Sequence, residues 1–248
     1  GDNTDPITIS TRWIYTFEPD EGNISKWIRK GKDGTILPTD GFIFKGPGVA
    51  QNYTFTGSPN DGKLTTKTIG ENESYLIGNP FSSALSAKKF IYDNIDELDA
   101  NGNIINDKGS ITGSLYFWDH VGEKDTTSSA IAGHYQSGYL GGYATINIAM
   151  ETAANITIET EPAITDQDTY KKPGTYIPVG QGFFVVGDTD GGSIKFNNSQ
   201  REFVKEDNGT NSIFFKSGKK KEKNTTTNSR YLKSLPIVKL GMNAINNK

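Results

Sequence analysis

The stretch GQGFFVVG, residues 180–187, decides the fold class of this sequence. Its two phenylalanines and two valines, residues 183–186, are apolar without alternation, as in a strand that is covered on both faces. Phenylalanine and valine also favour strands, and glycines lie on both sides of the run. We therefore predict a central strand over residues 182–186, placed in the middle of a sheet.

Other runs with strand character recur along the chain. In residues 144–150, apolar side chains alternate with a largely polar set, which predicts a strand that covers a core on one side. Turn-forming sequences such as PNDG, residues 59–62, separate these runs. The strand-like runs are residues 11–17, 41–45, 52–56, 75–77, 114–118, 143–150, 155–159, 182–186, 193–196 and 212–216.

One segment, residues 82–94, has helical character. Ala84, Ala87 and Ile91 fall near the helical period, and either Ser82 or Ser83 is suited to cap the N-terminus. Together with the many strand-like runs, this predicts an all-β fold, a jelly-roll-like β-sandwich with one short helix packed on a sheet edge.

The composition excludes several classes of function. With 248 residues, the chain is long enough for one large core or two modest ones. The net charge of -3 gives no reason to expect a nucleic-acid partner, because nucleic-acid-binding proteins usually carry a basic excess. The absence of cysteine excludes disulfides and thiolate metal sites. No apolar run is long enough to span a bilayer, and we expect any export signal to lie outside this sequence.

A change in composition near the C-terminus predicts the domain organisation. Residues 1–216 form the predicted surface domain, and residues 217–230, rich in lysine and threonine, form a polar linker or long loop. Residues 231–248 become apolar again with alternation, as in a terminal strand. This strand either completes the sandwich or begins a following domain that is cut short.

The residues that usually carry catalysis show no recognisable arrangement. The two histidines, His120 and His134, lack the HxH or HExxH spacing that places two imidazoles on one face. There is no cysteine nucleophile and no GxSxG elbow. We therefore expect a non-catalytic protein. A polysaccharide-degrading enzyme stays open as an alternative, because its two carboxylates can be distant along the chain.

The segment DELDANGNIIND, residues 96–107, is a candidate metal site. It concentrates carboxylate and amide oxygens of the kind that calcium prefers, although it does not match the EF-hand pattern. The same residue types are common in tight turns, so a solvated loop is the competing interpretation. Calcium is the only cofactor that the sequence suggests. The candidate ligands are Asp96, Asp99, Asn101, Asn103 and Asp107.

Aromatic residues between 116 and 143 form the candidate binding surface. Tyr116 and Trp118 share one face of the predicted strand 114–118, opposite Leu115 and Phe117, and either face could be the buried one. Exposed flat rings stack on sugar faces and on peptide side chains. The residues predicted to form the ligand surface are Tyr116, Trp118, Asp119, His120, Tyr135 and Tyr139.

Several segments together resemble a module of secreted, multidomain Bacteroidetes proteins, many of which are exported by the type IX secretion system. The resemblance covers roughly residues 40–216 and then 232–243, and it rests on the order and spacing of the pieces. These pieces are DGFIFKGPG (40–48), QNYTFTGSPNDG (51–62), SYLIGNPFSSAL (74–85), GSLYFWDH (113–120), GGYATIN (141–147), IPVGQGFFV (177–185), IKFNNSQREF (194–203) and LKSLPIVKLGMN (232–243).

The resemblance implies a secreted or outer-surface location, a β-sandwich ahead of a sorting domain, and contact with the secretion machinery through the parent protein. It supplies no catalytic residues. The leading hypothesis is a binding or adhesion module for an extracellular glycan or protein, and the alternative is a structural spacer. An exposed aromatic patch favours the first, and burial of these rings favours the second.

Overall fold

The computed structural model describes residues 9–20, 24–45, 53, 55–123, 139–153, 171–205 and 212–215. The chain divides into two compact units, Gly1–Gly218 and Lys219–Lys248, and all the described residues lie in the first. The first unit is built mostly of antiparallel strands, with a single α-helix among its described residues, α1 (Ala87–Asn94). The all-β fold class is thereby confirmed, whereas the jelly-roll-like sandwich stays a prediction.

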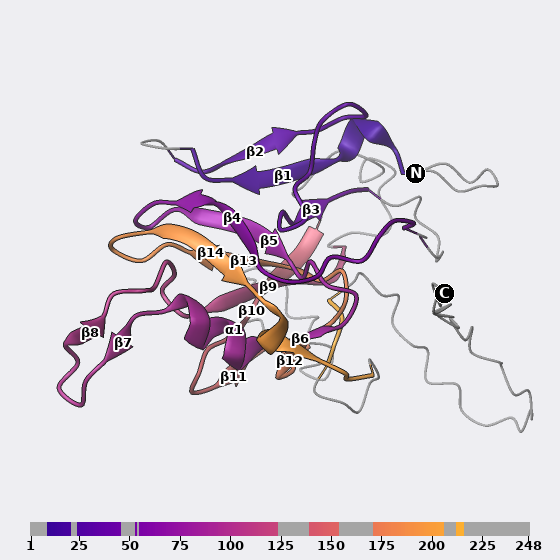
Figure 1. The fold of residues 1–248 in the computed structure, drawn as a ribbon. Helices are drawn as coiled ribbons and strands as arrows, with labels where there is room; N and C mark the ends of the chain where they lie inside the picture. The colour runs from indigo at the N-terminus through magenta and orange to yellow at the C-terminus, as the bar shows by residue number, and fades with distance from the viewer. Residues whose placement is uncertain are drawn as a thin grey trace, which may run out of the picture. The chain divides into compact units, whose positions relative to one another are not determined.

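The strands form sheets of two, three or five strands (Figure 1). The five-stranded sheet has the order β11-β10-β9-β13-β5, and one three-stranded sheet has the order β2-β1-β3. The strands of these two sheets are β11 (Glu151–Thr152), β10 (Tyr139–Ile146), β9 (Leu115–Glu123), β13 (Gly182–Val186), β5 (Ser74–Gly78), β2 (Lys26–Arg29), β1 (Tyr15–Glu18) and β3 (Phe42–Ile43).

Smaller sheets complete the described part of the fold. The second three-stranded sheet has the order β12-β6-β15, and two pairs, β14-β4 and β7-β8, form two-stranded ladders. Their strands are β12 (Tyr176–Ile177), β6 (Ala84–Ser86), β15 (Arg201–Glu202), β14 (Gly192–Phe196), β4 (Leu64–Ile69), β7 (Glu97–Leu98) and β8 (Ile104–Asn106). Two short 3-10 turns, η1 (Thr11–Trp13) and η5 (Asn198–Gln200), precede β1 and β15.

Strand β13 lies between β9 and β5, which confirms the predicted position within a sheet. Its two faces are not equivalent. Phe183 and Val185 are fully buried in the main core, whereas Phe184 and Val186 are only partly covered. The prediction that both faces are buried is therefore wrong for the second face, where aromatic rings from other strands cover Phe184 incompletely.

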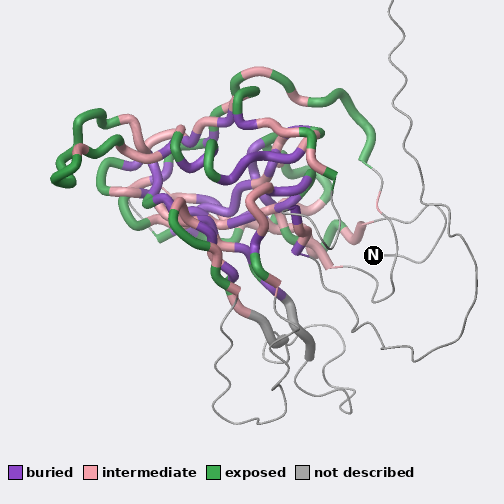
Figure 2. The backbone as a smooth tube through the Cα atoms, turned by 90° about the horizontal axis from the view of Figure 1, so that it is seen from below, coloured by how far each residue is buried: buried purple, intermediate pink, exposed green. Residues whose placement is uncertain are grey.

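The main core lies between the inner face of the five-stranded sheet and the elements packed against it. Helix α1 contributes Phe90, whose ring contacts Phe183 edge to face at 5.6 Å. Figure 2 shows the buried residues gathered in the sheets, with exposed residues at the connecting loops. The largest fully buried side chains are Tyr75, Phe81, Phe90, Phe183, Phe196, Ile69, Ile77, Leu85, Ile91, Ile111, Leu115 and Ile146.

The helix is shorter than the predicted 82–94. It begins at Ala87, and its N-cap is Ser86, whose hydroxyl accepts a hydrogen bond from the backbone N–H of Lys89. Residues 84–86 are instead the central strand β6, which pairs with β12 and β15. Pairing with strands that are distant in sequence therefore outweighs the local helical pattern.

Three other predicted strands differ from the structure. Residues 11–13 form the turn η1, and the strand begins at Tyr15. Strand β10 ends at Ile146, because the Asn147 side chain accepts hydrogen bonds from the N–H groups of Ala149 and Met150 and closes a turn. The described members of the run 52–56 are not in a strand, and the run 155–159 lies outside the described residues.

The last described segment, residues 212–215, completes the core. It makes only an isolated bridge, Tyr176 to Ser212, where a strand was predicted. Phe215 stacks on Phe117 with 5.3 Å between ring centroids, and its backbone N–H donates to the side chain of Gln181. The buried Gln181 thus satisfies a backbone N–H group of this segment through its side chain.

Candidate functional site

Strand β9 has one buried face and one exposed face. Leu115 and Phe117 are buried in the core, whereas Tyr116 is partly exposed and the side chain of Trp118 is 43% exposed. The question that the sequence left open is therefore settled: Tyr116 and Trp118 belong to the outer face of the five-stranded sheet. Trp118 pairs across the ladder with Tyr143 of β10, which is 47% exposed, and residues directly opposite each other in a ladder share a face.

Five rings form a continuous series on this outer face, which we call the aromatic row. Trp118 contacts Tyr143 at 5.2 Å between centroids, Tyr143 contacts Phe184 at 5.7 Å, and Phe184 contacts Phe17 at 5.5 Å. Phe17 of β1 then contacts Trp27 of β2 at 5.0 Å. The row joins the outer face of the five-stranded sheet to the sheet β2-β1-β3, which Figure 1 shows on the opposite side from α1.

Backbone pairing holds the two sheets beside each other. Asp40 forms an antiparallel bridge with Ile77, and the N–H of Gly41 donates to the carbonyl of Leu76 at 2.9 Å. The buried hydroxyl of Tyr75 donates to the Asp40 carboxylate at 2.5 Å. Burial and the Asp40 carboxylate together raise the pKa of the Tyr75 hydroxyl, so this group stays protonated and remains a donor.

A buried ion cluster fixes β1, the strand that carries Phe17. Glu18 has a side chain only 4% exposed and lies 2.5 Å from the Lys30 ammonium, and it also pairs with Lys67 and accepts from Thr16. Burial alone would raise the pKa of the Glu18 carboxyl, but the hydrogen bonds from Lys30, Lys67 and Thr16 lower it from 4.5 to about 2. The carboxylate therefore stays ionised and holds this face of β1, while Phe17 projects from the other.

Charge is sparse along the aromatic row. By strand alternation, the other described residues of the outer face of the five-stranded sheet carry no charge. Those whose side-chain environment is described are Ser74, Leu76, Gly78, Gly182, Val186, Tyr116, Thr145 and Thr152. On the adjoining sheet, Arg29 shares the side of Trp27 and donates its Nε to the carbonyl of Arg12. Partial burial raises the pKa of the Tyr143 hydroxyl, so this ring also stays neutral.

The remaining residues of the predicted ligand surface fall in different places. Asp119 is buried, because it alternates with Trp118 and faces inward, where its carboxylate accepts from the backbone N–H of Lys171 at 2.8 Å. Its assignment to the ligand surface is therefore wrong. His120 lies in β9 and Tyr139 in β10, but their side chains are outside the described set, and Tyr135 lies outside the described residues altogether.

Of the five rings of the aromatic row, only Trp118 was among the predicted ligand residues. Phe184 belongs to the run that was assigned to a doubly buried strand, so its partial exposure had no sequence signal. Phe17 and Trp27 pair across β1 and β2, and β2 was not predicted. Alternation along residues 15–18 predicts that Tyr15 and Phe17 share one face of the strand. The contact between Phe17 and Phe184 arises only from tertiary packing.

The residues of the predicted calcium segment lie in two groups, one at the tip and one at the base of the hairpin β7-β8. Asp99 closes the tip of the hairpin β7-β8: its carboxylate accepts from the N–H groups of Asn101 and Asn103 and from the Asn103 side chain. These local hydrogen bonds lower the pKa of the exposed Asp99 carboxyl. The hydrogen bonds of this group are therefore those of a tight turn, with Asp99 bonded to Asn101 and Asn103. They agree with the competing interpretation of the segment as a solvated loop.

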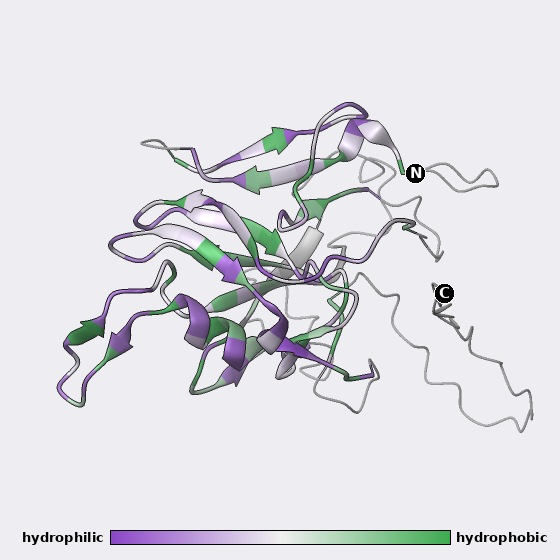
Figure 3. Cartoon of the chain, viewed as in Figure 1, coloured by the Kyte–Doolittle hydropathy of each residue, from purple (hydrophilic) through white to green (hydrophobic). Residues whose placement is uncertain are grey.

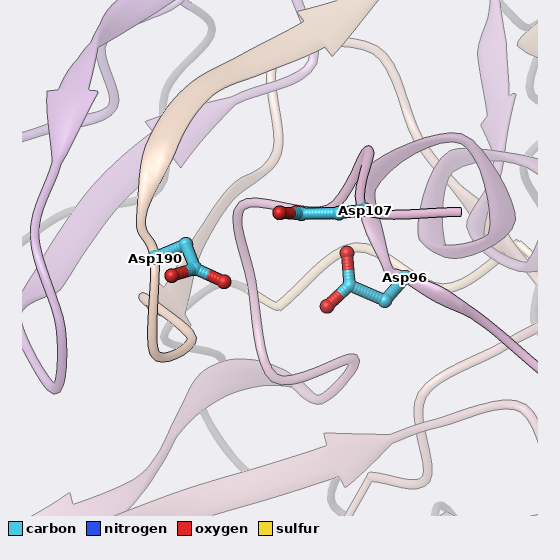
Figure 4. Close-up of side chains that lie close together, drawn as sticks. All are labelled: Asp96, Asp107 and Asp190. Carbon is cyan, nitrogen blue, oxygen red and sulfur yellow. The ribbon is translucent and has the colours of Figure 1, made fainter. Parts of the chain in front are cut away.

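Asp96 and Asp107, at the base of this hairpin, lie near a third carboxylate that was not predicted. One oxygen each of Asp96, Asp107 and Asp190 lies within 4.8 Å of the others (Figure 4). Asp96 also accepts from the backbone N–H groups of Lys108 and Gly109. Burial, together with the charges of Asp96 and Asp190, raises the pKa of the neighbouring Asp188 carboxyl. Exposed acidic groups often gather without an ion, so calcium stays a prediction.

The hairpin β7-β8 also exposes apolar side chains. Leu98, Ile104 and Ile105 are each more than half exposed. Figure 3 shows the apolar strand β8 on the hairpin that projects from the sheets. These side chains are separate from the aromatic row.

The fold and the site define a class: an all-β domain, with one α-helix among its described residues, whose largest sheet carries a face of partly exposed aromatic rings. The chain belongs to the family described as Domain of unknown function (DUF8693), which matches residues 3–235. No curated protein and no solved structure matches the chain. No helix among the described residues is long and apolar enough to cross a membrane.

Proposed function

We propose that this domain is a non-catalytic module that binds an extracellular glycan through the aromatic row. The partial exposure of Trp118, Tyr143 and Trp27 supports this function, because these rings are packed against their neighbours and yet keep open surface. Neighbouring exposed aromatic rings that form one patch mark a binding surface more often than scattered single residues do, and contacts made by Trp and Tyr dominate binding energies.

Edge-to-face packing gives the row rigidity before any ligand arrives. Trp118 meets Tyr143 at an interplanar angle of 68°, and Tyr143 meets Phe184 at 88°. Rings held in this way lose little conformational freedom on binding, which reduces the entropic cost of association. We propose export to the outer surface as the setting in which such a module meets its glycan, in keeping with the secreted family that the sequence resembles.

A glycan-array screen of the purified domain tests the proposal, run with calcium and again with a chelator. We expect binding to a defined class of sugar, and its loss in Trp118→Ala. Tyr92→Ala is the matched control, because Tyr92 is an exposed aromatic residue on α1, away from the row. Circular dichroism checks that both variants are folded.

Each other outcome favours a different function. If the folded domain binds no glycan on the array, the result favours the structural spacer, and a protein ligand would be sought next. Binding that Trp118→Ala leaves unchanged rejects the aromatic row as the site. Release of reducing sugar from a bound polysaccharide would instead support the alternative of a polysaccharide-degrading enzyme.

A further inference from the structure

A group of basic residues adjoins the aromatic row at Trp27. Arg29 lies two residues from Trp27 in β2, so the two side chains share one face of the sheet β2-β1-β3. The Nε–H of Arg29 donates to the backbone carbonyl of Arg12 at 3.2 Å, and both arginines are exposed. The Arg12 guanidinium and the Lys45 ammonium lie 5.6 Å and 5.8 Å from the centre of the Trp13 ring. We call Arg12, Arg29 and Lys45 the basic cluster.

Acidic residues along β1 and β2 do not neutralise this cluster. Glu18 of β1 and the nearby Asp20 already pair with lysines. Asp33, in the turn after β2, forms no ion pair with either arginine, and the ion pairs among the described residues include neither Arg12 nor Arg29. The two guanidinium groups therefore carry positive charge that an anionic ligand would neutralise.

Trp27 joins the basic cluster to a compact group of rings. Its own ring packs edge to face on Phe17 at 5.0 Å and on Phe184 at 6.3 Å, and yet Trp27 remains 45% exposed. The two Nη groups of Arg29 make no hydrogen bond with a described residue, because only its Nε–H is used. An open indole and two free pairs of N–H donors therefore lie on one face of a single strand.

We infer that the ligand is an acidic polysaccharide of uronic acid units, whose carboxylates bind the guanidinium groups of Arg29 and Arg12 while a sugar ring packs against Trp27. This inference rests on the proposed function. A uronic acid carries its carboxylate at the rim of a ring with an apolar C–H face, so one unit matches an indole beside a guanidinium. The guanidinium binds the carboxylate through two parallel, charge-assisted hydrogen bonds. An acidic peptide offers carboxylates without the sugar face.

Calorimetric titration at low ionic strength tests the inference. The probes are hexamers of galacturonate, mannuronate and glucuronate, each compared with its own methyl ester, and a hexamer of glutamate as the acidic peptide. Esterification removes the charge and leaves the sugar rings, so we expect the acid form of the uronate that binds to be at least about tenfold tighter than its ester. Added salt should weaken binding of the acid and leave that of the ester unchanged.

Variants of single cations locate the charge that the ligand meets. Arg29→Gln is expected to lower the affinity for the acid by at least about tenfold and to leave the affinity for the ester unchanged. Arg29→Lys, which keeps the charge and loses the paired donors, should lie between the two. Lys88→Gln is the matched control, because Lys88 is exposed on α1, which Figure 1 shows on the opposite side from the sheet β2-β1-β3. Circular dichroism verifies the fold of each variant.

The possible failures are distinguishable. Acid and ester that bind equally well, or a neutral glycan that binds while all three uronates do not, overturn the acidic ligand and leave glycan binding by the row intact. Equal losses in Lys88→Gln and Arg29→Gln overturn the basic cluster as the site. A glutamate hexamer that binds as tightly as the uronates shows an acidic peptide to be the ligand of the cluster and overturns the polysaccharide. If neither the glycan array nor any uronate shows binding, the proposed function fails, and this inference fails with it.

Discussion

Replacement of Glu18 by glutamine should destabilise the domain by a predictable amount. Glu18 is almost fully buried, with ion pairs to Lys30 and Lys67. A carboxyl whose pKa falls from 4.5 in the unfolded chain to about 2 in the folded one contributes about 3 kcal/mol of folding free energy at neutral pH. Glu18→Gln removes this contribution and leaves Lys30 partly buried without its counter-charge.

The sign of the pH dependence follows from the lowered pKa. The stabilisation from Glu18 is complete above 4.5, the ordinary pKa of the group, and is lost as the pH falls toward about 2. The intact chain and Glu18→Gln should therefore differ most at neutral pH and least in acid. The difference between the two proteins isolates Glu18, because the other carboxyl groups titrate in both.

Urea unfolding of both proteins, near neutral pH and near pH 3, measures this difference. Asp20→Asn is the matched control: Asp20 pairs with Lys26 on the surface, where both side chains are well exposed, and exposed pairs contribute about 0–1 kcal/mol. A loss below about 1 kcal/mol in Glu18→Gln at neutral pH would refute the reasoning, as would a difference that does not shrink in acid.

Three further predictions test the packing and the acidic cluster. Gly191→Ala should lower the free energy of unfolding by more than about 2 kcal/mol, because Gly191 has φ +62° and an added Cβ would lie 2.1 Å from a carbonyl oxygen. Gly62→Ala is the control and should lower it by about 1 kcal/mol, because Gly62 has φ +77° but no atom within 4 Å of the added Cβ. Equal losses for the two variants in urea unfolding would contradict this prediction. Phe215→Ala should cost about 3 kcal/mol by the same measurement, since its ring is buried against the core, and a neutral effect would show that residues 212–215 are not part of the domain. If calcium raises the melting temperature, Asp107→Asn should abolish that rise, whereas Asp99→Asn should retain it. The reverse pattern would show that calcium binds at the tip of the hairpin β7-β8.

The sequence predicted the elements whose signal is local. The strand over 182–186 follows from composition, and alternation separates Leu115 and Phe117 from Tyr116 and Trp118 on two faces of one strand, although it did not tell which face is buried; both strands belong to the largest sheet. The start of the helix was misplaced because residues 84–86 owe their extended form to partners in β12 and β15. No local pattern carries that information.

The candidate site was predicted only in part, for a related reason. Trp118 lies on the exposed face with Tyr116, as the shared strand face required, but its neighbours in the row come from β10, β13, β1 and β2. In the same way, Asp190 was not among the predicted calcium ligands, although the fold places it beside Asp96 and Asp107. Contacts between distant segments depend on topology, which alternation and composition do not specify.

The most direct test of the central claim uses the three tryptophans of the chain as reporters. Their indole N–H resonances, assigned with single Trp→Phe variants, are followed by NMR as an oligosaccharide that binds on the glycan array is added. The account predicts that the Trp118 and Trp27 signals shift together with one saturation curve. Shifts absent from both Trp118 and Trp27, while the oligosaccharide demonstrably binds, would contradict the account and place the ligand elsewhere on the domain.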